Sequence, residues 1–156
     1  MIGIVAVSND GYISKDNSIP WDLPVDKKQW KHTVRNNPVI MGRKTFEQVP
    51  ARLTSDHIYV LTRTETYPEK DYATACKSKE EVMRHLSDTT QDVYILGGGK
   101  IYELFYNEME TVIVTEVDMS VDGDARFPLS YTEDFTPHVR IKFSNRPFEI
   151  VYSNRD

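Results

Sequence analysis

The sequence has a single cysteine, Cys76, which excludes an internal disulfide. It also lacks an apolar run long enough for a transmembrane helix or for the core of a signal peptide. We therefore expect a cytoplasmic protein that does not bind membranes. No run of lysine and arginine exceeds two residues and the net charge is −5, which argues against a nucleic-acid partner. These absences favour a small-molecule partner.

Several common catalytic patterns are missing as well. There is no Gly-x-Ser-x-Gly elbow, and Gly97-Gly98-Gly99-Lys100 lacks the spacing and the Ser/Thr of a Walker loop, so hydrolase and kinase functions have little support. The four histidines show neither i,i+4 pairing nor cysteine partners, so we expect them on the surface and predict no metal site. They are His32, His57, His85 and His138.

The composition is that of an ordinary globular protein. The chain has 156 residues, of which 39% are hydrophobic and 28% charged, with no internal repeat, low-complexity tract or linker-like segment. We expect one domain over residues 1–156 that folds alone and acts as a monomer.

Strand and helix patterns alternate along most of the chain. The nearly continuous apolar run Ile2–Val7 predicts a central strand covered on both faces. Further strands are predicted over 39–41, 58–61, 72–75, 92–96 and 111–117. Helices are predicted to begin near Val25 or Asp26, at Thr45, and after Ser78, which opens a Ser-x-x-Glu capping box. The segments 138–143 and 148–152 alternate and predict a hairpin.

The predicted fold class is therefore α/β. We expect a mostly parallel central sheet of about eight strands flanked by helices, with a C-terminal antiparallel hairpin at one edge. In such a sheet, ligands bind beyond the carboxyl ends of the strands.

The stretch from Pro20 to Lys31 combines a rigid turn with a carboxylate. Pro24 suits the first turn of a helix, because its missing N–H would be unpaired there anyway. Asp26 lies in that first turn, where the helix dipole favours the ionised form, and Trp30 follows one turn later on the same face. By itself this window is equally consistent with an ordinary first-turn acid and a core tryptophan.

Three predicted turns at strand ends suit an anionic ligand. The turn Gly42–Thr45 would present backbone N–H groups and two cations, although a solvated turn is an equal alternative. Thr62-Arg63-Thr64 offers hydroxyls and a cation after another strand. The triplet Gly97–Gly99 allows close approach to a pyrophosphate, but the further glycine of the usual dinucleotide fingerprint is absent.

Taken together, these motifs resemble the dihydrofolate reductase family. The resemblance rests on residues 17–26 (Asn-Ser-Ile-Pro-Trp-Asp-Leu-Pro-Val-Asp), 38–46 (Pro-Val-Ile-Met-Gly-Arg-Lys-Thr-Phe) and 95–102 (Ile-Leu-Gly-Gly-Gly-Lys-Ile-Tyr). Residues 121–128 also resemble the acidic loop that precedes the last strands of that family. The likeness spans nearly the whole chain, in the family's order and spacing.

The resemblance implies NADPH-dependent reduction of 7,8-dihydrofolate to tetrahydrofolate, with hydride transfer to C6 and protonation of N5. Asp26 matches the acid that accepts hydrogen bonds from the pterin's amino group and ring N–H. Trp21 matches a residue that holds an ordered water near the pterin carbonyl, while Tyr102 and Thr115 match residues near the nicotinamide and the acid. The implied catalytic residues are Asp26, Trp21, Tyr102 and Thr115.

The resemblance also assigns the two binding sites. The implied substrate-pocket residues are Val5, Val7, Ile19, Asp26, Trp30, Val49, Leu96 and Thr115. The implied cofactor residues are Ala6, Ile13, Gly42, Arg43, Lys44, Thr45, Leu61, Thr62, Arg63, Lys77, Gly97, Gly98, Gly99, Lys100, Ile101 and Tyr102. Arg43, Thr62 and Arg63, assisted by Lys77, are the candidates for the 2′-phosphate of NADPH. Ile19, in the loop from Ile13 to Leu23, would shield the hydride path from water.

The sequence departs from the family around residues 53–57. The family has a Pro-Gly-Arg pattern whose arginine binds the α-carboxylate of folate's glutamate tail, and Asp56 occupies that position in an ungapped alignment. Two carboxylates repel each other. Our hypothesis is that Lys27 and Lys31, at i,i+4 spacing, bind the tail together with Arg52. The alternative is that both lysines are simply solvated.

Two other functions stay open at this point. One is reduction of a pterin or pyrimidine without a glutamate tail, as in the riboflavin-pathway reductases that share this fold. Asp26 and its Pro-Trp context argue against that substrate class. The other is a non-catalytic binding or structural role, which the presence of Asp26, Trp21 and the three glycines argues against.

Overall fold

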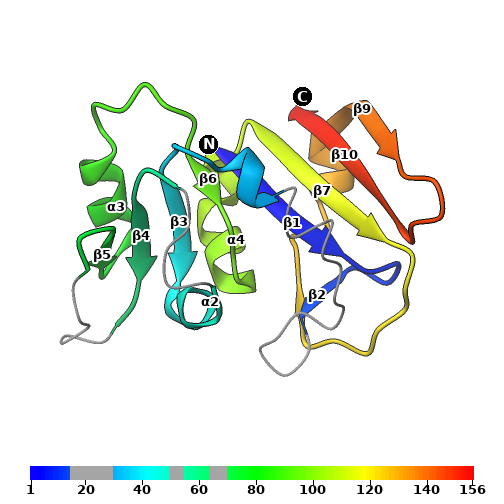
Figure 1. The fold of residues 1–156 in the computed structure, drawn as a ribbon, viewed down its shortest axis with the longest axis horizontal. Helices are drawn as coiled ribbons and strands as arrows, with labels where there is room; N and C mark the ends of the chain where they lie inside the picture. The colour runs from blue at the N-terminus through cyan, green and yellow to red at the C-terminus, as the bar shows by residue number, and fades with distance from the viewer. Residues whose placement is uncertain (15–29, 50–54, 64–69) are drawn as a thin grey trace.

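The computed structural model describes residues 1–14, 30–49, 55–63 and 70–156. Its main feature is an eight-stranded sheet. The strands are β1 (Ile2–Val7), β3 (Val39–Gly42), β4 (Ile58–Leu61), β5 (Ala73–Cys76), β6 (Tyr94–Ile95), β7 (Thr111–Val117), β9 (Phe135–Lys142) and β10 (Phe148–Arg155). Their order is β5-β4-β3-β6-β1-β7-β10-β9, so β1 is an interior strand, as predicted (Figure 1).

The directions of the strands confirm the predicted fold class. All pairings from β5 to β7 are parallel, whereas β10 is antiparallel to both β7 and β9. The two antiparallel strands form the C-terminal hairpin at one end of the sheet, and β5 lies at the other end (Figure 1).

The helices of the described residues are short. They are α2 (Arg43–Gln48), α3 (Lys79–His85), α4 (Gly99–Phe105), α5 (Tyr131–Asp134) and the 3-10 helix η1 (Tyr106–Glu108). Residues 30–33 are also helical, but the predicted start of their helix near Asp26 lies outside the described residues. The Ser78 hydroxyl accepts the Glu81 N–H at 3.1 Å, which confirms the predicted cap of α3. None of the helices in the described ranges is long and apolar enough to cross a membrane.

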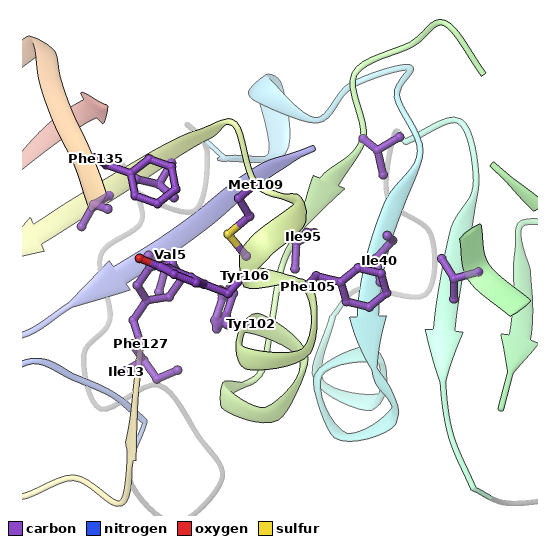
Figure 2. Packing of buried hydrophobic residues seen from close by; sticks show 14 of the residues in the cluster. Val5, Ile13, Ile40, Ile95, Tyr102, Phe105, Tyr106, Met109, Phe127 and Phe135 are labelled. Atoms are coloured by element: carbon purple, nitrogen blue, oxygen red, sulfur yellow. The ribbon is translucent and has the colours of Figure 1, made fainter. Parts of the chain in front are cut away.

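Side chains along β1 alternate between two core clusters on the two faces of the sheet. The first core cluster includes Val5, Val7, Val82 of α3 and Phe105 of α4. The second core cluster, around Val34, Val39 and Met41, is contacted from β1 by Ile2, Ile4 and Ala6. This separation follows from the two-residue period of a strand. Figure 2 shows part of the first core cluster, where buried aromatic residues of α4 and η1 face the sheet.

A second, two-stranded sheet was not predicted. In it β2 (Tyr12–Ser14) is antiparallel to β8 (Ala125–Arg126), whereas the sequence indicated an irregular segment and a turn. The Arg126 guanidinium stacks over the Tyr12 ring at 4.2 Å, and the Asp124 N–H donates to the Ser14 carbonyl at 3.0 Å. Strands this short show no periodicity, and their pairing depends on contacts between distant parts of the chain.

Replacing Phe105 by alanine should lower the free energy of unfolding by about 3–5 kcal/mol, because the ring is fully buried and its loss leaves a cavity. The neighbouring Leu104 is 43% exposed, so Leu104→Ala should change the free energy of unfolding by no more than about 0.5 kcal/mol. Urea denaturation followed by circular dichroism measures both. Equal losses in the two variants would contradict this packing.

Candidate active site

The predicted glycine turn after β6 is held by contacts with β1 and β3. The Gly97 carbonyl accepts the N–H of Gly42 at 2.8 Å, which joins the end of β3 to the turn. The buried Tyr102, on α4, donates its hydroxyl to the Ile4 carbonyl of β1 at 2.6 Å. The turn is therefore fixed to two neighbouring strands at the carboxyl end of the parallel sheet.

Gly97 occupies a position that only glycine tolerates well. Its φ is +105°, and a Cβ added there would lie 3.0–3.1 Å from three atoms of the Tyr102 ring and hydroxyl. The peptide bond between Gly97 and Gly98 is cis. The backbone of the turn thus packs directly against the tyrosine ring.

Gly98, in contrast, has space beside it in the described part of the chain. Among the described residues, a Cβ added to Gly98 would have only the Thr45 hydroxyl within 4 Å, at 3.8 Å. The Gly98 carbonyl accepts the N–H groups of Ile101 and Tyr102, both at 3.0 Å, so it begins α4. The turn therefore leaves room for a group bound against its backbone, next to the start of α2.

Cationic side chains follow the carboxyl ends of three neighbouring strands. Arg43 and Lys44 follow β3, and both are exposed; Arg43 is 3.4 Å from Glu47 in an i,i+4 ion pair. Arg63 and Lys77 are exposed after β4 and β5. One hydrogen bond joins the ends of these two strands: the buried Thr62 donates its N–H to the Cys76 carbonyl at 2.9 Å. Lys100, in the first turn of α4, is exposed as well.

The residues predicted for the substrate pocket are divided between the two faces of the sheet. Trp30, Val49 and Leu96 pack against the second core cluster. Thr115 is buried on β7, opposite Ile150 of that cluster. Ala6, predicted as a cofactor residue, also contacts the second core cluster.

The side chains of Val5 and Val7 lie on the other face, in the first core cluster with Tyr102. The side chains of Val5 and Val7 are therefore on the face opposite to those of Trp30 and Leu96. Strand alternation is the physical reason.

Several predicted residues lie outside the described part of the chain, namely Ile19, Trp21, Asp26, Lys27 and Arg52. Among the others, Lys31 and Leu61 are half-buried. Ile13, on β2, is buried, and its Cδ1 lies 3.8 Å from where a Cβ on Gly99 would be. Asp56, the residue that departs from the family pattern, is exposed and donates its N–H to the Asn37 carbonyl at 3.0 Å.

The prediction that all four histidines lie on the surface is wrong for His57. Its ring is half-buried, with Nε2 2.7 Å from the Thr74 hydroxyl and the ring packed against Tyr59. Burial lowers the pKa of His57 below its ordinary value. The ring contacts Thr74 of β5 because β4, which follows His57 directly, pairs with β5. The spacing of residues in the sequence does not reveal this pairing. The Ile4 carbonyl, which orients Tyr102, was missed for the same reason.

The fold is that of an α/β protein with an open, mostly parallel sheet, a class that binds ligands beyond the carboxyl ends of its strands. Comparison with known proteins specifies the class. The family model described as dihydrofolate reductase matches residues 1–152. The chain is 35% identical over 133 residues to the dihydrofolate reductase of Lactococcus lactis, covering 84% of this chain and 79% of that protein. It is 31% identical over 152 residues to the dihydrofolate reductase of Staphylococcus haemolyticus, covering 96% and 90%.

A solved structure gives the same result at the level of the fold. The dihydrofolate reductase from Enterococcus faecalis complexed with NADP(H) and RAB-propyl superimposes with a TM-score of 0.83. The match covers 99% of this chain and 95% of that one, at 22% sequence identity. This chain therefore belongs to the dihydrofolate reductase family. Its activity is the reduction of dihydrofolate to tetrahydrofolate, with NADP(H) as the cofactor.

Gly97→Ala should lower the free energy of unfolding by about 2 kcal/mol or more, because alanine is strained at this φ and its Cβ meets Tyr102. Gly98→Ala is the matched control, since its Cβ enters open space and should leave stability unchanged. Thermal and urea denaturation test both. In Gly98→Ala, the KM for NADPH should nevertheless rise at least about tenfold, which corresponds to about 1.4 kcal/mol. A Gly98→Ala enzyme with an unchanged KM would show that no ligand lies against this backbone.

Proposed function

We propose that Asp26, Trp21, Tyr102 and Thr115 are the catalytic residues of this dihydrofolate reductase. NADPH, when bound, supplies the hydride that reduces C6 of dihydrofolate. An ionised Asp26 can accept hydrogen bonds from both the amino group and a ring N–H of the pterin, and these two bonds fix the orientation of the ring. Trp21 would hold a water near the pterin carbonyl. N5 can gain its proton from water. Thr115, buried on β7, would support that carboxylate.

The observation that supports this proposal most directly is the position of Tyr102. Its ring is buried against Gly97, and its hydroxyl is bonded to β1 through the Ile4 carbonyl. The edge of an aromatic residue is thereby held where the turn after β6 meets β1. Open parallel sheets bind their ligands beyond the carboxyl ends of such strands, which supports a site here.

We assign the cofactor to the turns at the strand ends. The open space beside Gly98 and Thr45 fits a pyrophosphate bound to backbone N–H groups. The 2′-phosphate would be bound by Thr62, Arg63, Lys77 and Arg43. The three cations follow the ends of adjacent strands, where they can form charge-assisted hydrogen bonds to one phosphate. The remaining proposed cofactor residues are Ala6, Ile13, Gly42, Lys44, Leu61, Gly97, Gly99, Lys100, Ile101 and Tyr102.

We assign the pterin to the face that carries the second core cluster. Trp30, Val49 and Leu96 would form the apolar wall, with Ile19 closing over it. Val5 and Val7 contribute through their backbone, since their side chains belong to the opposite face. Asp56 is expected to stand where the family has its tail-binding arginine. We propose that Lys27, Lys31 and Arg52 bind the glutamate tail instead.

We further propose that the protein is a single-domain monomer of the cytoplasm. Both edge strands have features that disfavour pairing with a second sheet. The edge strand β9 carries Pro137, a register irregularity opposite Tyr152 and Ser153, and the charged residues Arg140 and Lys142. The opposite edge, β5, has only four residues. A single buried cysteine is compatible with a reducing compartment.

The experiment that tests the catalytic assignment is NADPH oxidation by wild type and Asp26→Asn, with dihydrofolate and with a pterin that lacks the aminobenzoyl-glutamate tail. Asp26→Asn should lower kcat/KM by about 100-fold or more. Its residual rate should rise as the pH falls, because the substrate must then arrive already protonated. Asp71→Asn, at an exposed acid before β5, is the matched control and should keep the wild-type profile. A wild-type rate in Asp26→Asn would remove the acid from the mechanism.

The tail-binding proposal is tested by Lys27→Met combined with Lys31→Met. Each charge-assisted hydrogen bond contributes about 1.5–3 kcal/mol, so the KM for dihydrofolate should rise about tenfold or more. The KM for NADPH and the kinetics with the tail-less pterin should not change. Lys70→Met removes an exposed lysine elsewhere and serves as the control. An unchanged KM for dihydrofolate would show that both lysines are solvated helix residues.

A further inference from the structure

The fold brings three side chains of metal-binding type together at the corner between β5 and α3. The thiol of Cys76, a carboxylate oxygen of Glu81 and an imidazole nitrogen of His85 all lie within 4.8 Å of one another. In a tetrahedral zinc site with these ligand types, neighbouring ligand atoms are about 3.3–3.8 Å apart, given bonds of about 2.0–2.3 Å. The three groups are therefore close to a coordinating arrangement, and small side-chain movements complete it.

Regular secondary structure sets this arrangement. Cys76 is the last residue of β5, and Glu81 and His85 are on α3 at i,i+4 spacing, which places them on one face of the helix. Ser78 caps α3 two residues after Cys76, through the hydrogen bond to the Glu81 N–H at 3.1 Å. The cap holds the helix face against the end of the strand. The cluster is thus built on rigid elements.

Two of the three ligands are also held in orientation by neighbours. One oxygen of Glu81, Oε2, accepts the Lys77 N–H at 2.8 Å, which leaves its other oxygen for a cation. The His85 ring packs against the Tyr59 ring, with centroids 5.6 Å apart. His85 is exposed and Glu81 half-buried, so an ion can reach the cluster from solvent. Cys76 forms its buried side.

The charges of the ligands match a divalent cation. A divalent cation that binds would release the proton of the Cys76 thiol to solvent, and its two positive charges would balance the thiolate and the Glu81 carboxylate. A soft thiolate combined with imidazole selects Zn²⁺ and similar ions over Mg²⁺ or Ca²⁺.

We propose that Cys76, Glu81 and His85 form a binding site for a thiophilic divalent cation of the Zn²⁺ type, with a fourth position open to water. None of the three residues belongs to the proposed catalytic, substrate or cofactor residues, so the site does not depend on those assignments. The sequence predicted no metal site, because no short spacing connects a histidine to Cys76. The contact between β5 and α3 supplies the connection that spacing does not show.

The test is titration of the untagged full chain with Co²⁺, a spectroscopic substitute for Zn²⁺. Thiolate coordination gives a charge-transfer band in the near ultraviolet, and Cys76 is the only cysteine, so the band reports on this site alone. We expect a saturable band with one ion per chain, lost when Zn²⁺ is added. Cys76→Ser should abolish the band.

His85→Asn is the decisive variant, because the residue is exposed and its loss should not disturb folding. It should weaken Co²⁺ binding at least about tenfold, and Glu81→Gln should also weaken it. The matched controls are His138→Asn, at an exposed histidine on β9, and Glu80→Gln, at the exposed neighbour of Glu81. Both controls should bind Co²⁺ as wild type does, and circular dichroism should show that every variant is folded.

Two results would overturn the proposal. One is the absence of a charge-transfer band at millimolar Co²⁺ in wild-type protein that still reduces dihydrofolate. The other is equal Co²⁺ affinity in His85→Asn and His138→Asn, which would mean that the cysteine binds the ion without the helix. Dihydrofolate reduction by the metal-free chain is expected in either case, so failure here leaves the assigned activity unaffected.

Discussion

The absence of a side chain at Gly97 is the constraint on which the rest of the site depends. Gly97 has a φ of +105°, and the Tyr102 ring and hydroxyl lie 3.0–3.1 Å from where a Cβ on Gly97 would be. Tyr102 then bonds to β1 through the Ile4 carbonyl, and the Gly97 carbonyl bonds to Gly42 at the end of β3. One residue thereby joins β1, β3, β6 and α4 at the edge of the sheet where the ligands of this fold bind.

The strand order makes this the natural place for a binding site. From β1 the chain goes to β3 on one side of the sheet and, after β6, to β7 on the other. Strands that run to opposite sides leave a crevice beyond their carboxyl ends, because their connections diverge there. On β1 itself, alternation assigns Val5 and Val7 to the first core cluster and leaves the small Ala6 facing the second. Both faces of β1 thus pack against a hydrophobic core cluster.

The chain differs from its family in ways that affect recognition more than chemistry. The proposed difference concerns Asp56, an exposed carboxylate, which we aligned without gaps to the arginine expected to bind the glutamate tail. The chemistry-bearing motifs of the family are retained in sequence. At the outer edge of the sheet, Cys76, Glu81 and His85 lie together where β5 meets α3. The Ser78 cap fixes the start of α3 there, and the three side chains are the ligands of the proposed cation site.

The fold class, the family and most strands of the main sheet follow from the sequence alone. Apolar runs, the Ser78 cap and the glycine turns are local signals, because each is contained in a short stretch of sequence. Only the tertiary structure decided the pairing of β2 with β8, the separation of Val5 from Trp30, the burial of His57, and the meeting of Cys76 with His85. Each of these depends on how one element pairs or packs with another, which the spacing of residues within a single element does not determine.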